Sequence, residues 1–442
     1  MLQESQEQKA PPSAKRPRIL AVLVLLILTL GSALLTLELG LRHFYQLIPL
    51  DVCANDEIFG SYYCQPYFVY DKPIRIGYRF KPNLHFETMW DPADPHLAAA
   101  ADETAPSDRS DAFLYRFDTD EMGFPNDEPT WRDQYDIIVT GDSFVTRTAP
   151  ETWIELLREQ TGQSILTLGA NSWSTLNEVE AVKMYGLDKN PKWVILLFFE
   201  GNDLINTAQY LERRDSGLDW REYDMQGVAW WRKLVTWQIA HYWLSDSEKT
   251  SQPEHYRYPV MVNTEVGELP TVLKDVHLLP MSANYEALAR SDEFAQVSAA
   301  LLELKKLVEA ENGRFLLVYV PSKEHVTWSR IWDPVDVNNI LERTVTVTLS
   351  QGDHGTLQWE PVYLDYNTFN ANHNAQEQLF IDFTQENGIE FMNLTPALWQ
   401  NTIEQGEMYH YADPHWNQAG NQLVADLIQD YLQTTGEING GD

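Results

Sequence analysis

The chain is poor in cysteine and in basic residues. Its 442 residues include only two cysteines, Cys53 and Cys64. Two are too few for a disulfide-stapled scaffold, a cysteine-bound iron–sulfur cluster or a cysteine-based zinc ribbon. Lysine and arginine together number 32 against 65 aspartates and glutamates, and the formal net charge is −33. A surface of that charge repels phosphate backbones, so we expect no nucleic-acid partner.

One long apolar segment lies near the N-terminus. Residues 19–37, ILAVLVLLILTLGSALLTL, carry no charge, and at about 1.5 Å per residue they nearly cross a hydrocarbon core of about 30 Å. Lysines and arginines precede them, so the positive-inside rule predicts a cytoplasmic basic tail over 1–18 and a single-pass membrane anchor over 19–41. The rest of the chain is then extracytoplasmic, at the cell membrane. A cleaved signal peptide is the alternative, although no small-residue cleavage site follows the run.

Both cysteines follow the predicted anchor closely. We expect residues 42–117 to form an extracytoplasmic linker or subdomain that contains them. Outside the cytoplasm, Cys53 and Cys64 are expected to form one disulfide across a short loop. The alternative is that they are two unpaired, small apolar side chains. Residues 51–135 look irregular and polar.

From residue 136 onward, the pattern alternates between short apolar strands and amphipathic helices. Strands are expected at 136–140, 164–168, 193–199, 314–320 and 389–393. Helices are expected at 153–160, 176–187, 296–310, 375–386 and 417–433. This alternation predicts parallel βαβ units in an α/β fold, a three-layer α/β/α sandwich with a central parallel sheet. Two long segments rich in Trp, Tyr and Pro, about 204–290 and 326–370, are expected to be insertions, and 436–442 a C-terminal tail.

Three of the predicted strands end in glycine and polar residues. The first ends in Gly141-Asp142-Ser143, the second in Gly169-Ala170-Asn171 and the third in Glu200-Gly201-Asn202-Asp203. Asp413-Pro414-His415-Trp416-Asn417 precedes the last helix. Sites in open parallel sheets form at the carboxyl ends of the strands. A serine, a glycine, an asparagine and a histidine in this order could supply the nucleophile, oxyanion donors and base of acyl transfer.

These four blocks resemble the SGNH (GDSL-type) hydrolase superfamily. The resemblance covers residues 118–435 and implies a flavodoxin-like hydrolase domain. It implies that Ser143 is the nucleophile, that His415 is the base and that Asp413 orients His415. It implies no metal and no cofactor.

The same resemblance implies an oxyanion hole. Its donors would be the backbone N–H groups of Ser143 and Gly169 and the side-chain amide of Asn202. The chain departs from the usual pattern in two places near these residues. No glycine follows the serine in Ser143-Phe-Val-Thr-Arg-Thr148, and the glycine of the third block directly precedes Asn202.

The acidic residue also departs from the usual pattern. Asp413 stands two residues before His415, whereas the usual position, three before, is Ala412. This D-x-H-W motif resembles the alginate O-acetyltransferase-like (AlgX/AlgJ-like) group, in which the Asp-x-His precedes the serine. Pro321-Ser-Lys-Glu324 resembles that group as well. Two other carboxylates near the strand ends, Asp142 and Asp203, are alternative partners for His415.

The sequence therefore predicts a membrane-anchored extracytoplasmic serine esterase or O-acyltransferase. Its substrate would be an ester, an O-acetyl group in particular, on a carbohydrate or cell-surface glycan, and a membrane acyltransferase could be its partner. The alternatives are a non-catalytic glycan-binding or polysaccharide-assembly factor and a lipid esterase.

Two further groups of side chains have simpler interpretations. We expect core packing for the insertion tryptophans, with carbohydrate stacking as the alternative; they are Trp230, Trp231, Trp237 and Trp243. We expect surface or cleft positions for the histidines that lack metal-ligand spacing; they are His241, His325, His354, His373 and His410.

Overall fold

The computed structural model divides the chain into two compact units. One consists of Met1–Pro66 with Ala229–Asp246, and the other of Tyr67–Val228 with Ser247–Asp442. The structure describes residues 16–44, 48, 68–90, 112–128, 130–224, 226–227, 229–244, 257–331, 340–341, 345–349, 357–361 and 364–435. The predicted disulfide falls outside these residues.

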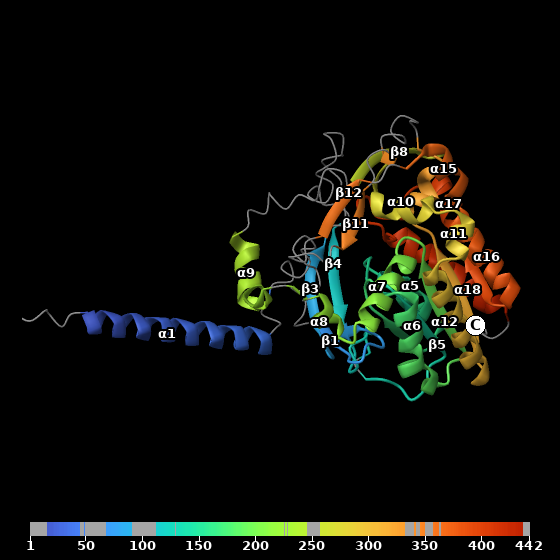
Figure 1. Ribbon diagram of the computed structural model, residues 1–442. Helices are drawn as coiled ribbons and strands as arrows, with labels where there is room; N and C mark the ends of the chain where they lie inside the picture. The colour runs from blue at the N-terminus through green and yellow to red at the C-terminus, as the bar shows by residue number, and fades with distance from the viewer. Residues whose placement is uncertain are drawn as a thin grey trace, which may run out of the picture. The chain divides into compact units, whose positions relative to one another are not determined.

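The larger unit is built around a five-stranded sheet (Figure 1). Its strands are β5 (Ile137–Gly141), β6 (Ile165–Gly169), β7 (Trp193–Phe199), β10 (Arg314–Val320) and β13 (Glu390–Asn393). Their order is β13-β10-β7-β5-β6, and every pairing in the sheet is parallel. The predicted parallel α/β fold is confirmed, with strand bounds that shift by at most one residue.

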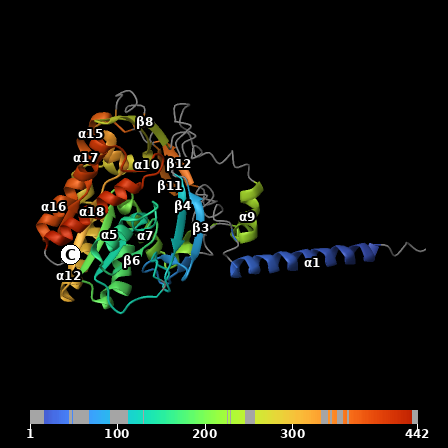
Figure 2. The same cartoon turned by 180° about the vertical axis from the view of Figure 1, so that it is seen from behind.

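Helices cover both faces of this sheet (Figure 1 and Figure 2). Along β7, Val194, Leu196 and Phe198 belong to one buried cluster, whereas Ile195 and Leu197 belong to the other. Successive side chains of a strand point to opposite faces, so a strand between two helical layers is apolar throughout. The first face is covered by α6 (Thr175–Ala181), α7 (Asp203–Asp215), α12 (Asp292–Ala310) and α16 (Ala375–Asn387). The second is covered by α5 (Trp153–Thr161), α17 (Thr395–Gln405) and α18 (Gln418–Thr434).

The expectation of irregular structure before the first sheet strand is wrong for part of its range. The described residues there form two antiparallel pairs. β1 (Phe68–Tyr70) pairs with β2 (Tyr78–Phe80), and β3 (His85–Trp90) pairs with β4 (Phe113–Asp118). β1 and β2 have three residues each, and β3 pairs with β4 across more than twenty intervening residues, so the sequence gives little local signal for these strands.

The two predicted insertions share a hydrophobic core of their own. The first contributes the hairpin β8 (Arg257–Thr264) and β9 (Gly267–Lys274) and helix α10 (Asp275–Ser282). The second includes α15 (Tyr366–Asn372), and α13 (Lys323–Trp328) leads into it. Described members of this core, from both insertions, are Val262, Leu273, Leu278, Trp328 and Phe369.

The smaller unit contains the N-terminal helix α1 (Arg16–His43) and helix α9 (Val235–Leu244). Leu20–His43 is long and apolar enough to cross a membrane, and no residue of its apolar 18-residue window is buried. The expectation that the insertion tryptophans pack in a core is wrong here. Trp230 and Trp243 are 73% and 70% exposed, and Trp231 and Trp237 are also exposed. All four belong to the same compact unit as α1.

Candidate active site

Ser143 lies at the point where β5 turns into a short helical segment. Asp142 caps that segment, Ser143–Val145, by accepting a hydrogen bond from the backbone N–H of Phe144 at 3.1 Å. A side chain on Gly141 would place its Cβ 2.8 Å from Val145 Cγ1. Glycine at the end of β5 therefore allows the chain to turn tightly, and the turn presents the Ser143 hydroxyl at the carboxyl edge of the sheet.

The structure brings Ser143, His415 and Asp413 together. His415 Nε2 lies 2.7 Å from Ser143 Oγ, and His415 Nδ1 lies 2.5 Å from Asp413 Oδ1. Asp413 Oδ1 also accepts the backbone N–H of His415 at 3.0 Å. All three residues are partly exposed. A hydroxyl, an imidazole and a carboxylate in this order form a hydrogen-bonded relay that a substrate could reach.

The electrostatics suit a base at His415 Nε2. Burial on its own would raise the pKa of Asp413, but the charge of His415 and its hydrogen bond outweigh burial and hold that pKa well below its usual value. The carboxylate therefore stays ionised and can only accept hydrogen bonds. We assign the proton of neutral His415 to Nδ1 on this basis, which leaves the Nε2 lone pair directed at Ser143.

The other two candidate carboxylates have different partners. Asp142 accepts the Phe144 N–H and the Asn202 side-chain amide, whose Nδ2 lies 3.2 Å from Asp142 Oδ2. Asp203 accepts the backbone N–H of Phe199 at 3.0 Å. Among the described residues, Asp413 is the carboxylate that contacts His415 Nδ1.

Three carboxyl groups lie buried behind the strand ends. Burial raises the pKa of Asp142, and it raises the pKa values of Asp203 and Glu178 well above their usual range. The charge of Asp142 further raises the pKa values of Asp203 and Glu178. Both carboxyl oxygens of Glu178 are buried without a hydrogen-bond partner. Burial thus shifts Glu178 and Asp203 toward the neutral acid beneath the site.

Asn202 and Gly169 occupy strand ends on either side of β5. The amide nitrogen of Asn202 carries two hydrogens, and the bond to Asp142 uses one. The second is free to meet a substrate oxygen. A Cβ on Gly169 would lie 2.3 Å from Val145 Cγ2 and 2.4 Å from Gly141 O. Gly169 is therefore required for the close contact between β6 and the serine turn, whatever its backbone N–H does.

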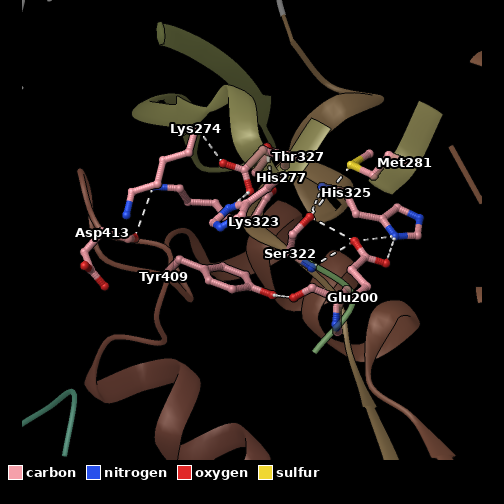
Figure 3. A network of polar contacts seen from close by, with 12 residues as sticks. Glu200, Lys274, His277, Met281, Ser322, Lys323, His325, Thr327, Tyr409 and Asp413 are labelled. Atoms are coloured by element: carbon pink, nitrogen blue, oxygen red, sulfur yellow. Dashed lines mark hydrogen bonds and ion pairs between the residues drawn. The ribbon is translucent and has the colours of Figure 1, made fainter. Parts of the chain in front are cut away.

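The loop that carries Asp413 and His415 is held by a buried lysine that sequence reasoning missed (Figure 3). Lys323 is 2% exposed, and its Nζ donates to the backbone carbonyls of His410 at 3.1 Å, Tyr411 at 2.9 Å and Asp413 at 3.2 Å. The signal was present in the sequence, because Lys323 belongs to the Pro-Ser-Lys-Glu segment that follows β10. The residues around Lys323 in the sequence do not indicate which loop its side chain contacts.

A buried ion pair lies beside the lysine (Figure 3). His325 Nδ1 lies 2.8 Å from Glu200 Oε2, and Glu200 Oε1 accepts the N–H of Ser322 at 3.0 Å. Burial on its own would lower the pKa of His325, but the charge and hydrogen bonds of Glu200 outweigh it and raise the pKa to about 9. The surface or cleft position expected for His325 is therefore wrong, and so is that for His410, since both are buried.

Aromatic packing and a helix cap complete the loop. The ring of Phe144 lies 5.0 Å from that of His415 and 4.7 Å from that of Trp416. Trp416 is completely buried. The side chain of Asn417 accepts the backbone N–H of Gly420 at 3.0 Å and caps α18. His415 is thus held between a buried tryptophan and the start of a helix.

Comparisons with known proteins find similar folds only. No protein-family model and no curated protein sequence matches the chain. A GDSL-like lipase from Bacteroides thetaiotaomicron is 8% identical over 68% of this chain and 88% of its own, with a TM-score of 0.31. A lipase/acylhydrolase from Enterococcus faecalis is 10% identical over 69% and 98%, with a TM-score of 0.31. An acetylxylan esterase from Geobacillus stearothermophilus is 12% identical over 70% and 97%, with a TM-score of 0.29. Similarity at these scores says nothing about function, which is inferred from the side-chain geometry of the site.

Proposed function

We propose that this chain is a membrane-anchored serine esterase or O-acyltransferase of the SGNH type. The observation that carries the proposal is the relay from Ser143 Oγ through His415 to Asp413, with contacts of 2.7 Å and 2.5 Å. The relay stands at the carboxyl edge of a parallel sheet, where such folds place their sites. Its three residues come from two segments about 270 positions apart, at the ends of β5 and before α18.

The relay permits a two-step acyl transfer. Ser143 Oγ attacks the ester carbonyl carbon while its proton passes to His415 Nε2, and a tetrahedral intermediate forms. The intermediate collapses, the bond to the alcohol oxygen breaks and the alcohol leaves with the proton from His415. The acyl group is then bonded to Ser143. Water attacks it in hydrolysis, and a sugar hydroxyl attacks it in transfer, while His415 Nε2 accepts the proton of the attacking group. The bond between the acyl carbon and Ser143 Oγ then breaks, and His415 returns the proton to Ser143 Oγ.

The oxyanion of the intermediate needs donors near Ser143. The backbone N–H groups of Ser143 and Gly169 and the second hydrogen of the Asn202 amide are the proposed set. The hydrogen bond from Asn202 to Asp142 supports this role, because it fixes the orientation of the amide before substrate arrives.

The proposed ester is an O-acetyl group on a carbohydrate or cell-surface glycan, which the D-P-H-W motif favours. In this proposal α1 anchors the chain in the cell membrane, and residues 118–435 form the extracytoplasmic catalytic domain. A membrane acyltransferase partner would deliver the acyl group if the reaction is transfer. The reaction requires no metal or organic cofactor for its proton and acyl steps.

Acetate release by the purified full-length chain tests the proposal. The substrates are 4-nitrophenyl acetate, acetylated xylan and a long-chain 4-nitrophenyl ester, with and without a sugar acceptor. We expect turnover of the acetyl esters, loss of turnover in Ser143→Ala and normal turnover in Ser298→Ala, a serine on α12. Preference for the long-chain ester would favour a lipid esterase. Absence of both turnover and a trapped acyl-serine would favour a non-catalytic glycan-binding or assembly factor.

A further inference from the structure

Helix α9 begins against the C-terminal part of α1, and a buried carboxylate joins the two. Glu38 of α1 is 5% exposed. Its carboxylate accepts the backbone N–H of Val235 at 3.0 Å and that of Thr236 at 2.9 Å, and it also accepts the Thr236 hydroxyl at 3.0 Å. These N–H groups are among the first of α9, which have no partner within their own helix. Glu38 therefore caps α9 from another helix.

A second contact closes the same junction. Arg42 Nε lies 2.6 Å from Glu38 Oε1, and Arg42 Nη2 donates to the carbonyl of Lys233 at 3.1 Å. The charge of Glu38 is thus matched by an arginine and by the positive end of a helix. That arrangement explains how an acidic residue is tolerated directly after an uncharged run of nineteen positions, 19–37.

The junction falls at a defined depth if α1 spans a membrane. A hydrocarbon core of about 30 Å takes about 20 helical residues. Counted from Leu20, where the candidate span begins, this places Glu38 close to the far boundary of the core. Helix α9 starts at that boundary and runs across the direction of α1 (Figure 1 and Figure 2). It therefore has the direction of a helix that lies in the plane of the membrane.

The composition of this segment suits that position. Its exposed side chains include Trp230, Trp237, Trp243 and Leu244, which is 84% exposed. Residues 229–244 contain Arg232 and Lys233 but no acidic residue, in a chain that has 65. Tryptophan with neighbouring basic residues is enriched where a bilayer changes from hydrocarbon to headgroups.

We propose that residues 229–244, which are α9 and the turn before it, form an interfacial membrane-binding element. The exposed tryptophans of this segment would contact the lipid bilayer. The inference rests on the proposed membrane anchor and extends it from one helix to two. A single spanning helix leaves a following domain free to pivot on its linker. A second element held at the surface by Glu38 and Arg42 removes part of that freedom.

Photo-crosslinking of the full-length chain in nanodiscs tests the inference. A benzophenone amino acid replaces Trp243, Trp399 or Leu30 in discs of phosphatidylcholine and phosphatidylglycerol. Leu30 lies inside α1 and reports the anchor, and Trp399, an exposed tryptophan of α17, is the matched control. We expect lipid adducts at 30 and 243 and none at 399.

Each other result has a defined meaning. Lipid adducts at 30 without any at 243 would overturn the inference and leave the anchor intact. Loss of lipid adducts at 30 would overturn the anchor, and the inference with it. A protein adduct in place of lipid at 243 would assign this surface to a partner chain and overturn the inference. None of these outcomes depends on esterase activity, so failure of the proposed chemistry remains distinguishable.

A second measurement avoids the unnatural residue. Brominated lipids quench tryptophans that lie near them, and we expect Trp243→Phe to lower the quenchable part of the fluorescence while Trp399→Phe leaves it unchanged. Glu38→Ala should speed hydrogen exchange in 235–244 and leave exchange in β5 and β7 as it was. Equal quenching in the two tryptophan variants would contradict the placement of α9.

Discussion

Asp413 and His415 are separated by one proline, and this spacing sets the geometry of the relay. Pro414 has a fixed φ and disfavours helical backbone at Asp413. In the structure one carboxylate oxygen accepts both the backbone N–H and the ring Nδ1 of His415, at 3.0 Å and 2.5 Å. The acid therefore follows the histidine whenever the loop moves. An acid on a different element would lack this coupling.

The first residue-scale prediction concerns this acid. Asp413→Asn keeps the shape of the side chain but removes the charge that fixes the Nδ1–H tautomer and stabilises the imidazolium. We expect kcat to fall by up to about 10⁴, the size of this effect in a well-studied serine protease. Ester hydrolysis at saturating substrate measures it. Asp430→Asn, on the exposed side of α18, is the control, and a near-normal kcat in Asp413→Asn would reject the assigned role.

The second prediction concerns Asn202. Its side-chain amide donates to Asp142 and makes no capping bond to α7. We therefore expect Asn202→Ala to lower kcat by about 10²–10³, the usual effect of losing one oxyanion donor, with little change in melting temperature. Asn206→Ala, one turn further along the same helix, serves as the control. If kcat were unaltered, Asn202 would have no part in the oxyanion hole.

At the scale of elements, the sequence predicts the strands and helices that have a regular apolar pattern. It does not predict strand pairs and contacts that depend on residues far away in the chain. The strand β7 is apolar at all seven positions, and this pattern allowed its bounds to be predicted as they are. The pairs β1–β2 and β3–β4 have no comparable local pattern. The order of the sequence blocks and their resemblance to SGNH hydrolases predicted that Ser143 stands at a strand end and that His415 precedes the last helix. The structure brings these two residues together. The carbonyls held by Lys323 lie about 90 residues away, so no local pattern indicates them.

Lys323 gives the first prediction at this scale. Lys323→Met would remove the ammonium donor from three backbone carbonyls, two of them in buried contacts. Each such loss at a buried oxygen costs roughly 1–3 kcal/mol when nothing replaces it. We expect lower thermal stability and, because the 410–413 loop carries Asp413, a lower kcat with a smaller change in KM. Steady-state kinetics below the melting temperature separate the two effects. Lys306→Met, exposed on α12, is the control; a stable variant with normal kcat would show that the loop holds its position without Lys323.

The Glu200–His325 pair makes stability depend on pH. Since the pKa of His325 is about 9 in the folded protein, above its ordinary value of 6.5, the protonated pair contributes fully below pH 6.5. Its contribution is lost as the pH rises through 9. We expect the difference in unfolding free energy between wild type and His325→Gln to shrink by on the order of 3 kcal/mol between about pH 6 and about pH 9.5. Urea unfolding at several pH values measures it, and a difference that stays constant would contradict the charged pair.

At the scale of the whole molecule, charge is divided unevenly along the chain. The positively charged side chains before the apolar run 19–37 favour a cytoplasmic N-terminus if α1 spans a membrane. After α1 the chain is strongly acidic, except for residues 229–244. A strongly acidic domain is repelled by anionic lipid. If α1 is the proposed anchor, α1 and the basic, aromatic segment around α9 are the parts expected to meet the membrane.

The last prediction tests this topology through the two cysteines. Cys53 and Cys64 follow the anchor within about 20 residues, and outside the cytoplasm a pair so closely spaced is expected to be oxidised. The disulfide would close a loop of about 12 residues, which stabilises a fold by roughly 2–4 kcal/mol. We expect non-reduced peptide mapping of membrane-extracted protein to show one Cys53–Cys64 cross-linked peptide, and an intact N-terminus in the same sample. In whole spheroplasts, a membrane-impermeant thiol reagent should label the two cysteines only after the disulfide has been reduced. Two free thiols, shielded from that reagent until the membrane is opened, would place the domain in the cytoplasm and reverse the topology.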